Sequence, residues 1–275
     1  MTRTATLHLL ALAALLTALP LRAETTPEQT FARGTQAIER GAYGEAIAEL
    51  ESLADRGFVH PDASYNRGLA YVGRARSLQS EPGDLGRAAA ALAEASLLRG
   101  GDPAADQALE LVRSEIARRL SRGGSAPVMA RPSLGRAVVT LASENVWAAV
   151  AALGSVAAAA GLALQRFSGR YSARLAGSVA FGVGLLLLVL GAALLASAGY
   201  LRRTTTPAVV VVDRARMLDE HGRPVAARAG EADAVPEGAE VYVTERRGGL
   251  SRIVWGNSEG WLIAGQIREL GLVRR

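Results

Sequence analysis

Few residues in this chain are suited to acid–base or metal chemistry. Its three histidines stand far apart: His8 lies in an apolar N-terminal run, and His60 and His221 lie in predicted loops of different regions. A histidine-based triad, or a zinc site with several histidine ligands, therefore has too few parts. The chain has no cysteine, which excludes disulfides, thiolate ligands and a thiol nucleophile. It has no lysine either, which excludes a Walker-type phosphate loop.

Most carboxylates are spaced as on the solvated faces of helices, which argues against paired acid–base catalysis. These residues are Glu39, Glu45, Glu49, Glu51, Glu94, Glu110 and Glu115. All 31 basic residues are arginine and the net charge is +5, but the arginines are scattered and several flank apolar runs. This distribution argues against nucleic-acid binding. We expect no enzyme activity, no cofactor and no metal.

The N-terminal segment has the pattern of an export signal. Arg3 precedes an apolar run of about 13 residues, Leu7–Leu19, which is shorter than the roughly 20 residues that span a bilayer. Pro20 ends the run, and cleavage after Ala23 would make residues 1–23 a signal peptide. An uncleaved anchor is the alternative. Either reading places the following residues outside the cytoplasm.

Residues 24–121 show helical spacing and contain two matching segments. Gly34 and Gly68 are 34 residues apart, the period of TPR repeats. In each segment small residues stand where two antiparallel helices meet, and a glycine, Gly41 or Gly83, ends the first helix. The second segment has about eight extra residues between its helices, around Ala75 to Pro82, so either its first helix is longer or a loop protrudes there. The full signature is Gly34, Gly41, Tyr43 and Ala46, then Gly68, Gly83, Leu85 and Ala88. A generic helical bundle is the alternative to this docking array.

A linker rich in Gly, Pro and Ser (122–145) precedes two uncharged stretches. Residues 146–164 form a stretch of 19 that is rich in Ala, and residues 175–201 form a stretch of 27 that is richer in Leu. We expect two transmembrane helices joined by a short loop, 165–174. Small residues recur four apart, a spacing that lets membrane helices pack closely. These pairs are Gly154 with Ala158, Ala157 with Gly161, Ser178 with Gly182, and Ala180 with Gly184.

The residues that flank the spans predict their orientation. Aromatic residues stand at the predicted membrane edges, and arginines are most frequent in the loop. The positive-inside rule then puts the loop in the cytoplasm and both domains in the periplasm, at a bacterial inner membrane. If the Ala-rich span stays out of the bilayer, the C-terminal domain is cytoplasmic instead. The flanking residues are Trp147, Arg166, Arg170, Arg174, Tyr200, Arg202 and Arg203.

From residue 206 the pattern changes to short β runs between turns. Residues 235–243 (VPEGAEVYV) and 259–262 (EGWL) resemble bacterial SH3-like domains, so we expect residues 206–275 to form a small all-β barrel. Residues 213–234 match that pattern poorly and are expected to form a long, mobile loop. The predicted strands are Ala208–Val212, Glu240–Glu245, Leu250–Trp255 and Gly260–Ile263. The candidate ligand surface is Tyr242, Trp255 and Trp261, with a core role as the alternative for the two tryptophans.

The order of these parts resembles the TPR/SH3 membrane component of bacterial aerotolerance (Bat) operons, the BatE-like proteins. Spans of that family typically begin with a tryptophan after a polar residue, as Glu144-Asn-Val-Trp147 does here. The resemblance implies von Willebrand A-domain Bat proteins as partners in the same membrane and, indirectly, a MoxR-type ATPase. It also implies a role in envelope stress or in the assembly of envelope complexes.

We therefore expect a multidomain membrane protein that binds other proteins and the lipid bilayer. Its all-α TPR-like region would dock envelope partners. The alternative is a module that binds peptidoglycan or a peptide through the SH3-like domain.

Overall fold

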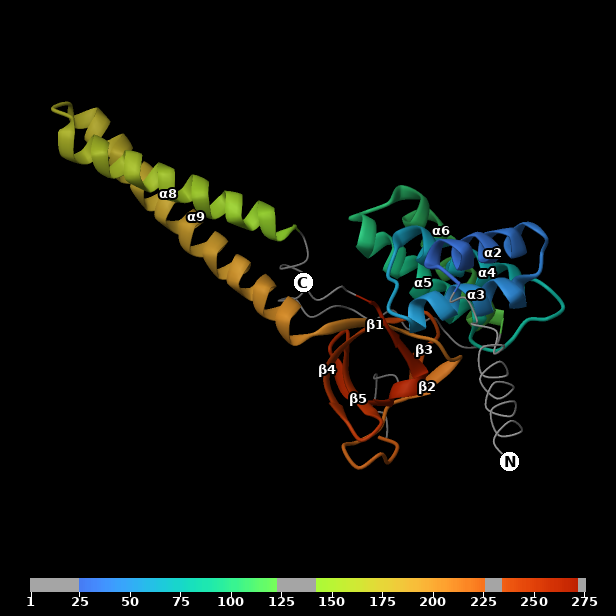
Figure 1. The fold of residues 1–275 in the computed structure, drawn as a ribbon. Coiled ribbons are helices and arrows are strands. Elements are labelled where there is room, and N and C mark those ends of the chain that lie inside the picture. The colour runs from blue at the N-terminus through green and yellow to red at the C-terminus, as the bar shows by residue number, and fades with distance from the viewer. Residues whose placement is uncertain (1–24, 123–141, 226–233, 272–275) are drawn as a thin grey trace, which may run out of the picture.

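The computed structural model describes residues 25–122, 142–225 and 234–271. The expected signal peptide (1–23) and most of the linker (122–145) lie outside the described residues. Figure 1 shows three parts: a helical region, two long helices that project from the rest, and an antiparallel sheet. The helical region consists of α2 (Pro27–Glu39), α3 (Tyr43–Asp55), α4 (Pro61–Ala75), α5 (Asp84–Arg99) and α6 (Pro103–Arg122).

Local signals fix the ends of these helices. Thr26 caps α2 in a capping box with Gln29, and Gly41, with φ of +72°, follows the end of α2 as predicted. The prediction that Gly83 ends the first helix of the second pair is wrong, and of the two alternatives for the extra residues the structure has the loop. Helix α4 ends at Ala75, and Gly83, with φ of +83°, directly precedes α5. The intervening loop is held by Arg74, whose guanidinium donates to carboxylates at both the loop and the start of α5.

The helix pairs α2/α3 and α4/α5 each contain the same kind of close contact, in which a glycine of the first helix faces a leucine of the second. A Cβ added to Gly34 would lie 2.8 Å from Cγ of Leu50 on α3. A Cβ added to Gly68 would lie 2.6 Å from Cγ of Leu92 on α5. Each glycine therefore lets the second helix of its pair approach the first. The two glycines are 34 residues apart, so the sequence repeat coincides with a repeat in packing.

The projecting helices are α8 (Glu144–Phe167) and α9 (Tyr171–Thr204), and both are long and apolar enough to cross a membrane. They extend past the predicted spans, 146–164 and 175–201, and only residues 168–170 separate them. At 1.5 Å per residue, 24 and 34 residues correspond to about 36 and 51 Å, against roughly 30 Å of hydrocarbon. Large apolar side chains cover their outer faces, among them Leu153, Val156, Leu186 and Val189.

Glycines bring α8 and α9 into backbone contact. A Cβ on Gly154 would lie 2.4 Å from the amide nitrogen of Leu188, and one on Gly184 would lie 2.4 Å from that of Ala158. The predicted role of Gly154 and Ala158 in this contact agrees with their burial. Gly182 faces open space instead, with nothing within 4 Å. The buried glycines of α9 recur every seven residues, so the four-residue spacing identified only part of the contact.

The sheet has five antiparallel strands in the order β6-β5-β4-β1-β7, and it is not a closed barrel. Strands β2 and β3 pair separately, so the predicted loop over 213–234 contains β2, and β3 begins at its last residue. Paired positive-φ glycines, Gly248 and Gly249, form the tight turn between β4 and β5. The strands are β1 (Thr206–Val210), β2 (Arg214–Arg216), β3 (Ala234–Pro236), β4 (Glu240–Arg247), β5 (Leu250–Trp255), β6 (Ser258–Ile263) and β7 (Ile267–Glu269).

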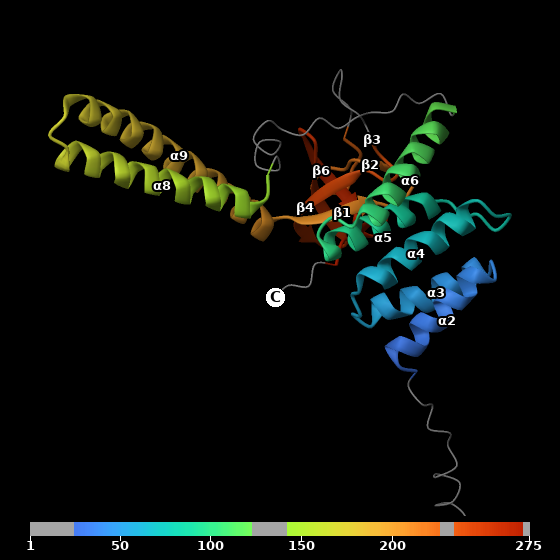
Figure 2. The same cartoon turned by 90° about the horizontal axis from the view of Figure 1, so that it is seen from above.

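Strand β1 and the residues just after it belong to two hydrophobic cores. Ala208 and Val210 pack inside the sheet, whereas Val209 and Val211 pack into the core of the helical region. Successive side chains of a strand point to opposite faces, so this apolar run is buried on both sides. Figure 2 shows α5 and α6 lying beside the sheet. The helical region and the sheet therefore form one packed unit, at one end of the α8–α9 pair.

Candidate functional site: the interface between the helices and the sheet

The start of α5 touches the main chain that follows β1. A Cβ on Gly83 would lie 2.2 Å from the carbonyl oxygen of Val211. A Cβ on Gly86 would lie 2.8 Å from the carbonyl oxygen of Val210. Only residues without a side chain permit this approach, which places the N-terminus of a 16-residue helix directly at the sheet.

Glu237, in the turn after β3, reaches the same end of α5. Its Oε1 accepts a hydrogen bond of 2.7 Å from the amide of Gly86. The first amides of a helix lack partners within the helix, and its dipole favours a negative charge there. Burial nevertheless raises the pKa of Glu237 above its usual value, and Asp213 and Asp84 add like-charge repulsion. The hydrogen bond from Gly86 opposes this shift without cancelling it.

A second polar contact across the interface centres on Glu94 of α5, whose residue surface is 8% exposed. Its Oε2 accepts hydrogen bonds from the Ser64 hydroxyl at 2.7 Å and from the Arg67 guanidinium at 2.5 Å, both on α4. Its Oε1 accepts a hydrogen bond of 2.8 Å from the amide of Gly271, after β7. A buried carboxylate requires such partners. Glu94 therefore joins α4, α5 and the C-terminal end of the sheet.

Glu51 of α3 extends this network. Its carboxylate accepts a hydrogen bond of 2.9 Å from the Tyr71 hydroxyl and one of 2.7 Å from Arg268 of β7. Burial raises the pKa of Tyr71 above its ordinary value, and the charge of Glu51 adds to the shift. The prediction that Glu51 and Glu94 lie on solvated faces is wrong. Their partners at the sheet are 217 and 177 residues further along the chain, beyond the reach of helical periodicity.

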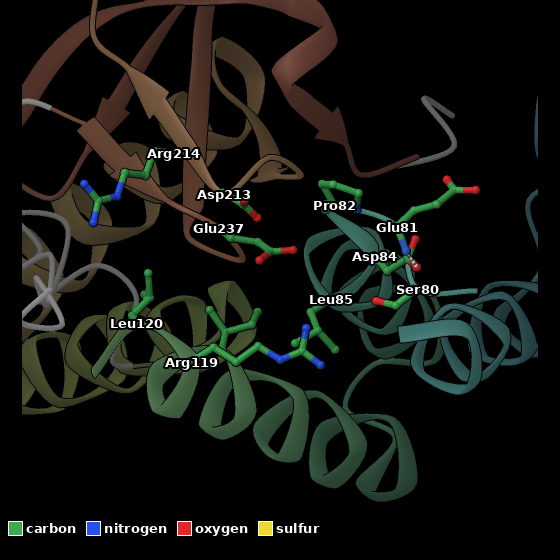
Figure 3. Close-up of a pocket in the computed structure, with 12 residues that line it drawn as sticks. Ser80, Glu81, Pro82, Asp84, Leu85, Arg119, Leu120, Asp213, Arg214 and Glu237 are labelled. Atoms are coloured by element: carbon green, nitrogen blue, oxygen red, sulfur yellow. Dashed lines mark hydrogen bonds between the residues drawn. The ribbon is translucent and has the colours of Figure 1, made fainter. Parts of the chain in front are cut away.

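A cavity of about 500 Å³ lies at this interface (Figure 3). Asp213 and Glu237 approach it from the sheet side, and Arg119 and Leu85 approach it from the helices. The Arg74 Nη2 lies 2.6 Å from the Oδ1 of Asp84, and this ion pair neutralises the Asp84 carboxylate. The complete lining is Ser80, Glu81, Pro82, Gly83, Asp84, Leu85, Ile116, Arg119, Leu120, Asp213, Arg214 and Glu237.

This cavity offers carboxylates and guanidinium groups beside aliphatic walls. Within the described ranges, no group of three or more histidine, aspartate or glutamate side chains is placed to hold a metal. The arrangement is suited to holding two parts of the chain together.

The remaining predicted repeat residues lie at helix contacts. Ala46 and Ala88 have no exposed surface, and Leu85 is 1% exposed. Tyr43 packs against α4, since a Cβ on Gly73 would lie 2.2 Å from the Tyr43 ring. Tyr43 therefore fills the space between the first helix pair and the next helix.

The predicted aromatic ligand surface is not a single surface. Trp255 lies on the inner face of β5, in the core of the sheet. Tyr242 and Trp261 alternate with core residues and lie on the outer face. Trp261 is only 8% exposed, because the Arg247 guanidinium lies 5.4 Å from its ring centre and its main chain pairs with Leu218. The structure thus favours a core role for Trp255 and a covered position for Trp261.

The membrane-flanking residues divide between the two ends of the α8–α9 pair. The Arg202 Nε lies 3.3 Å from the Glu144 Oε1. This ion pair joins the end of α9 to the start of α8, beside the sheet. Trp147 and Tyr200 lie toward this same end. The other end carries Arg166, Arg170 and Arg174. Arg203 follows Arg202 in the last turn of α9.

Sequence reasoning missed the residues that build the interface, chiefly Arg67, Gly86 and Glu237. One available signal was the continuous apolar run Ala208–Val212. Such a run is typical of a strand buried on both faces. In a strand with one solvated face, apolar and polar residues alternate. It predicts that a second layer covers β1, although it does not identify α5 as that layer.

Comparison with known proteins gives no relative: no protein-family model, no curated protein and no solved structure matches this chain. The class of this protein is therefore described by the arrangement of its parts. A helical region and an antiparallel sheet form one unit at the end of two apolar helices.

Proposed function

We propose that this protein is a non-catalytic, membrane-tethered scaffold whose TPR-like helix pairs dock partner proteins of the bacterial envelope. The observation that carries the proposal is the repeated packing of Gly34 on Leu50 and Gly68 on Leu92. Helix pairs that repeat in this way stack into extended binding surfaces.

A partly buried apolar face supports this assignment. Phe31 on α2 and Tyr65 on α4 are 34 residues apart, and so are Ile38 and Val72. All four are partly buried and pack at the edge of the helical core. Equivalent positions on successive first helices therefore present equivalent apolar side chains. We assign the docking face to these four residues.

The shared core supports a topology in which both spans insert together. The helical region and the sheet must lie on the same side of any bilayer, since Val209 and Leu270 pack among the helices. The chain between the two regions then crosses the bilayer twice or not at all. This requirement disfavours a single insertion of α9 that leaves the Ala-rich α8 outside. The arginines at the far end of the pair favour a cytoplasmic turn and a periplasmic scaffold.

Within this proposal, the partners are those that the resemblance to BatE-like proteins implies: A-domain membrane proteins and, through them, a MoxR-type ATPase. We expect the full chain to co-purify with an A-domain membrane protein in mild detergent. Tyr65→Gln combined with Phe31→Gln should weaken this association. Leu111→Gln, at a 57% exposed leucine of α6, is the matched control. Undiminished association of the double variant would contradict the docking face.

Two further results would contradict the wider proposal. Retention on purified peptidoglycan without any protein partner would instead favour the wall-binding alternative. Release of the intact chain by alkaline carbonate would contradict membrane insertion.

A further inference from the structure

The turn between α8 and α9 lies at the end of the helix pair remote from the sheet (Figures 1 and 2). Arg166 stands in the last turn of α8, Arg170 precedes α9, and Arg174 stands in the first turn of α9. Phe167 and Tyr171 flank the turn and are 86% and 82% exposed. Three guanidinium groups and two aromatic rings therefore surround a connection of three residues. We call these five residues the arginine tip.

Hydrogen bonds hold part of the arginine tip in place. The Arg174 Nε donates to the carbonyl oxygen of Ser168 at 2.8 Å, which folds this side chain back over the turn. The Ser168 hydroxyl accepts a hydrogen bond of 3.3 Å from the amide of Arg170. The terminal nitrogens of Arg174 remain free of any ion pair among the described residues.

No acidic side chain of the described residues pairs with the arginine tip. Residues 145–212 contain no acidic residue, and none of the three arginines forms an ion pair within the part of the chain that the structure describes. The opposite end of the pair differs, because Arg202 faces Glu144 there. A positive charge of three is thus confined to one end of two apolar helices.

We propose that the arginine tip binds the phosphate groups of anionic phospholipid headgroups. The proposal rests on the proposed membrane insertion, because the exposed apolar faces of α8 and α9 lead directly into the tip and place it at the headgroup layer. Guanidinium groups bind phosphate oxygens in a bidentate manner, and exposed aromatic rings favour the membrane interface. Each arginine near an anionic surface strengthens binding by roughly fivefold.

The test uses the full chain reconstituted in phosphatidylcholine vesicles with a trace of spin-labelled lipid. Electron paramagnetic resonance then compares how strongly spin-labelled phosphatidylglycerol and spin-labelled phosphatidylcholine associate with the protein. The wild-type chain should prefer phosphatidylglycerol. Arg170→Gln should lower this preference by up to roughly fivefold, and Arg166→Gln, Arg170→Gln and Arg174→Gln together should abolish it. Arg203→Gln, one exposed arginine removed at the other end, should change it less than Arg170→Gln.

Two controls make the outcomes decisive. A triple variant that keeps the wild-type preference overturns the proposal, as does an Arg203→Gln effect equal to that of Arg170→Gln. Inorganic phosphate should reduce the preference no more than chloride of equal ionic strength, and a specific effect of phosphate would indicate a free-anion site instead. Flotation and carbonate resistance of the same vesicles report insertion separately. Insertion without lipid preference overturns this inference alone, whereas failure to insert overturns the membrane assignment as well.

Discussion

The α8–α9 contact and the contact between α5 and the sheet both depend on glycine, but their surroundings differ. Between α8 and α9, glycines face main chain across the contact, and the outer surfaces are apolar. Between α5 and the sheet, glycines also face main chain, but the same interface contains hydrogen-bonded carboxylates, namely the buried Glu94 and the partly buried Glu237. Packing of small residues alone is suited to lipid, which offers no partner for a charge. At the contact between α5 and the sheet, the charged network stabilises one placement of the helical region relative to the sheet, because each buried charge needs its partner.

The largest expected effect tests the charged network. Arg67→Leu removes the guanidinium from Glu94, and the side chains of this pair are 5% and 11% exposed. Breaking one partner of a buried pair costs about 3–5 kcal/mol, so the free energy of unfolding should fall by that order. Urea titration of the full chain in micelles, followed by circular dichroism, measures it.

The matched control for this change is Arg76→Leu, which removes a 58% exposed guanidinium from Glu115. Exposed pairs contribute about 0–1 kcal/mol, so this variant should remain near wild type. Equal losses in the two variants would show that burial of the Arg67–Glu94 pair has no special role.

The next effect tests the glycine contact between the apolar helices. Gly184→Leu would drive a side chain into the main chain of Ala158, and overpacking of this kind costs about 1–3 kcal/mol. Gly182→Leu makes the same change two residues earlier, where nothing lies within 4 Å. We expect a lower melting temperature in micelles for the first variant only. Similar melting of both variants would show that α8 and α9 do not pack through Gly184.

A smaller effect of opposite sign is expected at Glu237. Its pKa is raised in the folded protein, so its contribution to stability is present at acidic pH and is lost as pH rises through the folded pKa. Glu237→Gln keeps an oxygen acceptor for Gly86 and removes the charge. The variant should therefore be more stable than wild type at neutral pH and converge with it at acidic pH. Melting temperatures across a pH series measure this, and lower stability at neutral pH would refute it.

The smallest effect is expected at the edge of the interface. Arg113 of α6 pairs with Glu240 of β4, and both side chains are well exposed. Water and salt screen such pairs, so Arg113→Ala should cost about 0–1 kcal/mol. A double-mutant cycle with Glu240→Ala isolates the pair. A coupling as large as the loss in Arg67→Leu would place this contact among the determinants of the interface.

Much of the outline follows from local sequence. The prediction of an N-terminal helical region, two long apolar helices and a C-terminal β region is confirmed, whereas the predicted closed barrel is an open antiparallel sheet. Gly41 marks a helix end, and Gly248 and Gly249 mark a turn, because positive φ depends on a residue and its immediate neighbours. The same local reasoning fails at Gly83, where the loop after α4 separates the glycine from the helix it was predicted to end.

The sequence by itself determined the order of the parts, the apolar character of α8 and α9 and the 34-residue repeat, since each is written in residues close together in the chain. Tertiary structure alone decided that Glu94 is buried and that Glu51 pairs with the sheet, that Glu237 reaches the start of α5, and that the aromatic residues of the sheet face different ways. These contacts join residues 151 to 217 positions apart or depend on which face of a strand is covered. Hydrophobic periodicity reports that a face is apolar, whereas the layer that covers it is chosen by packing.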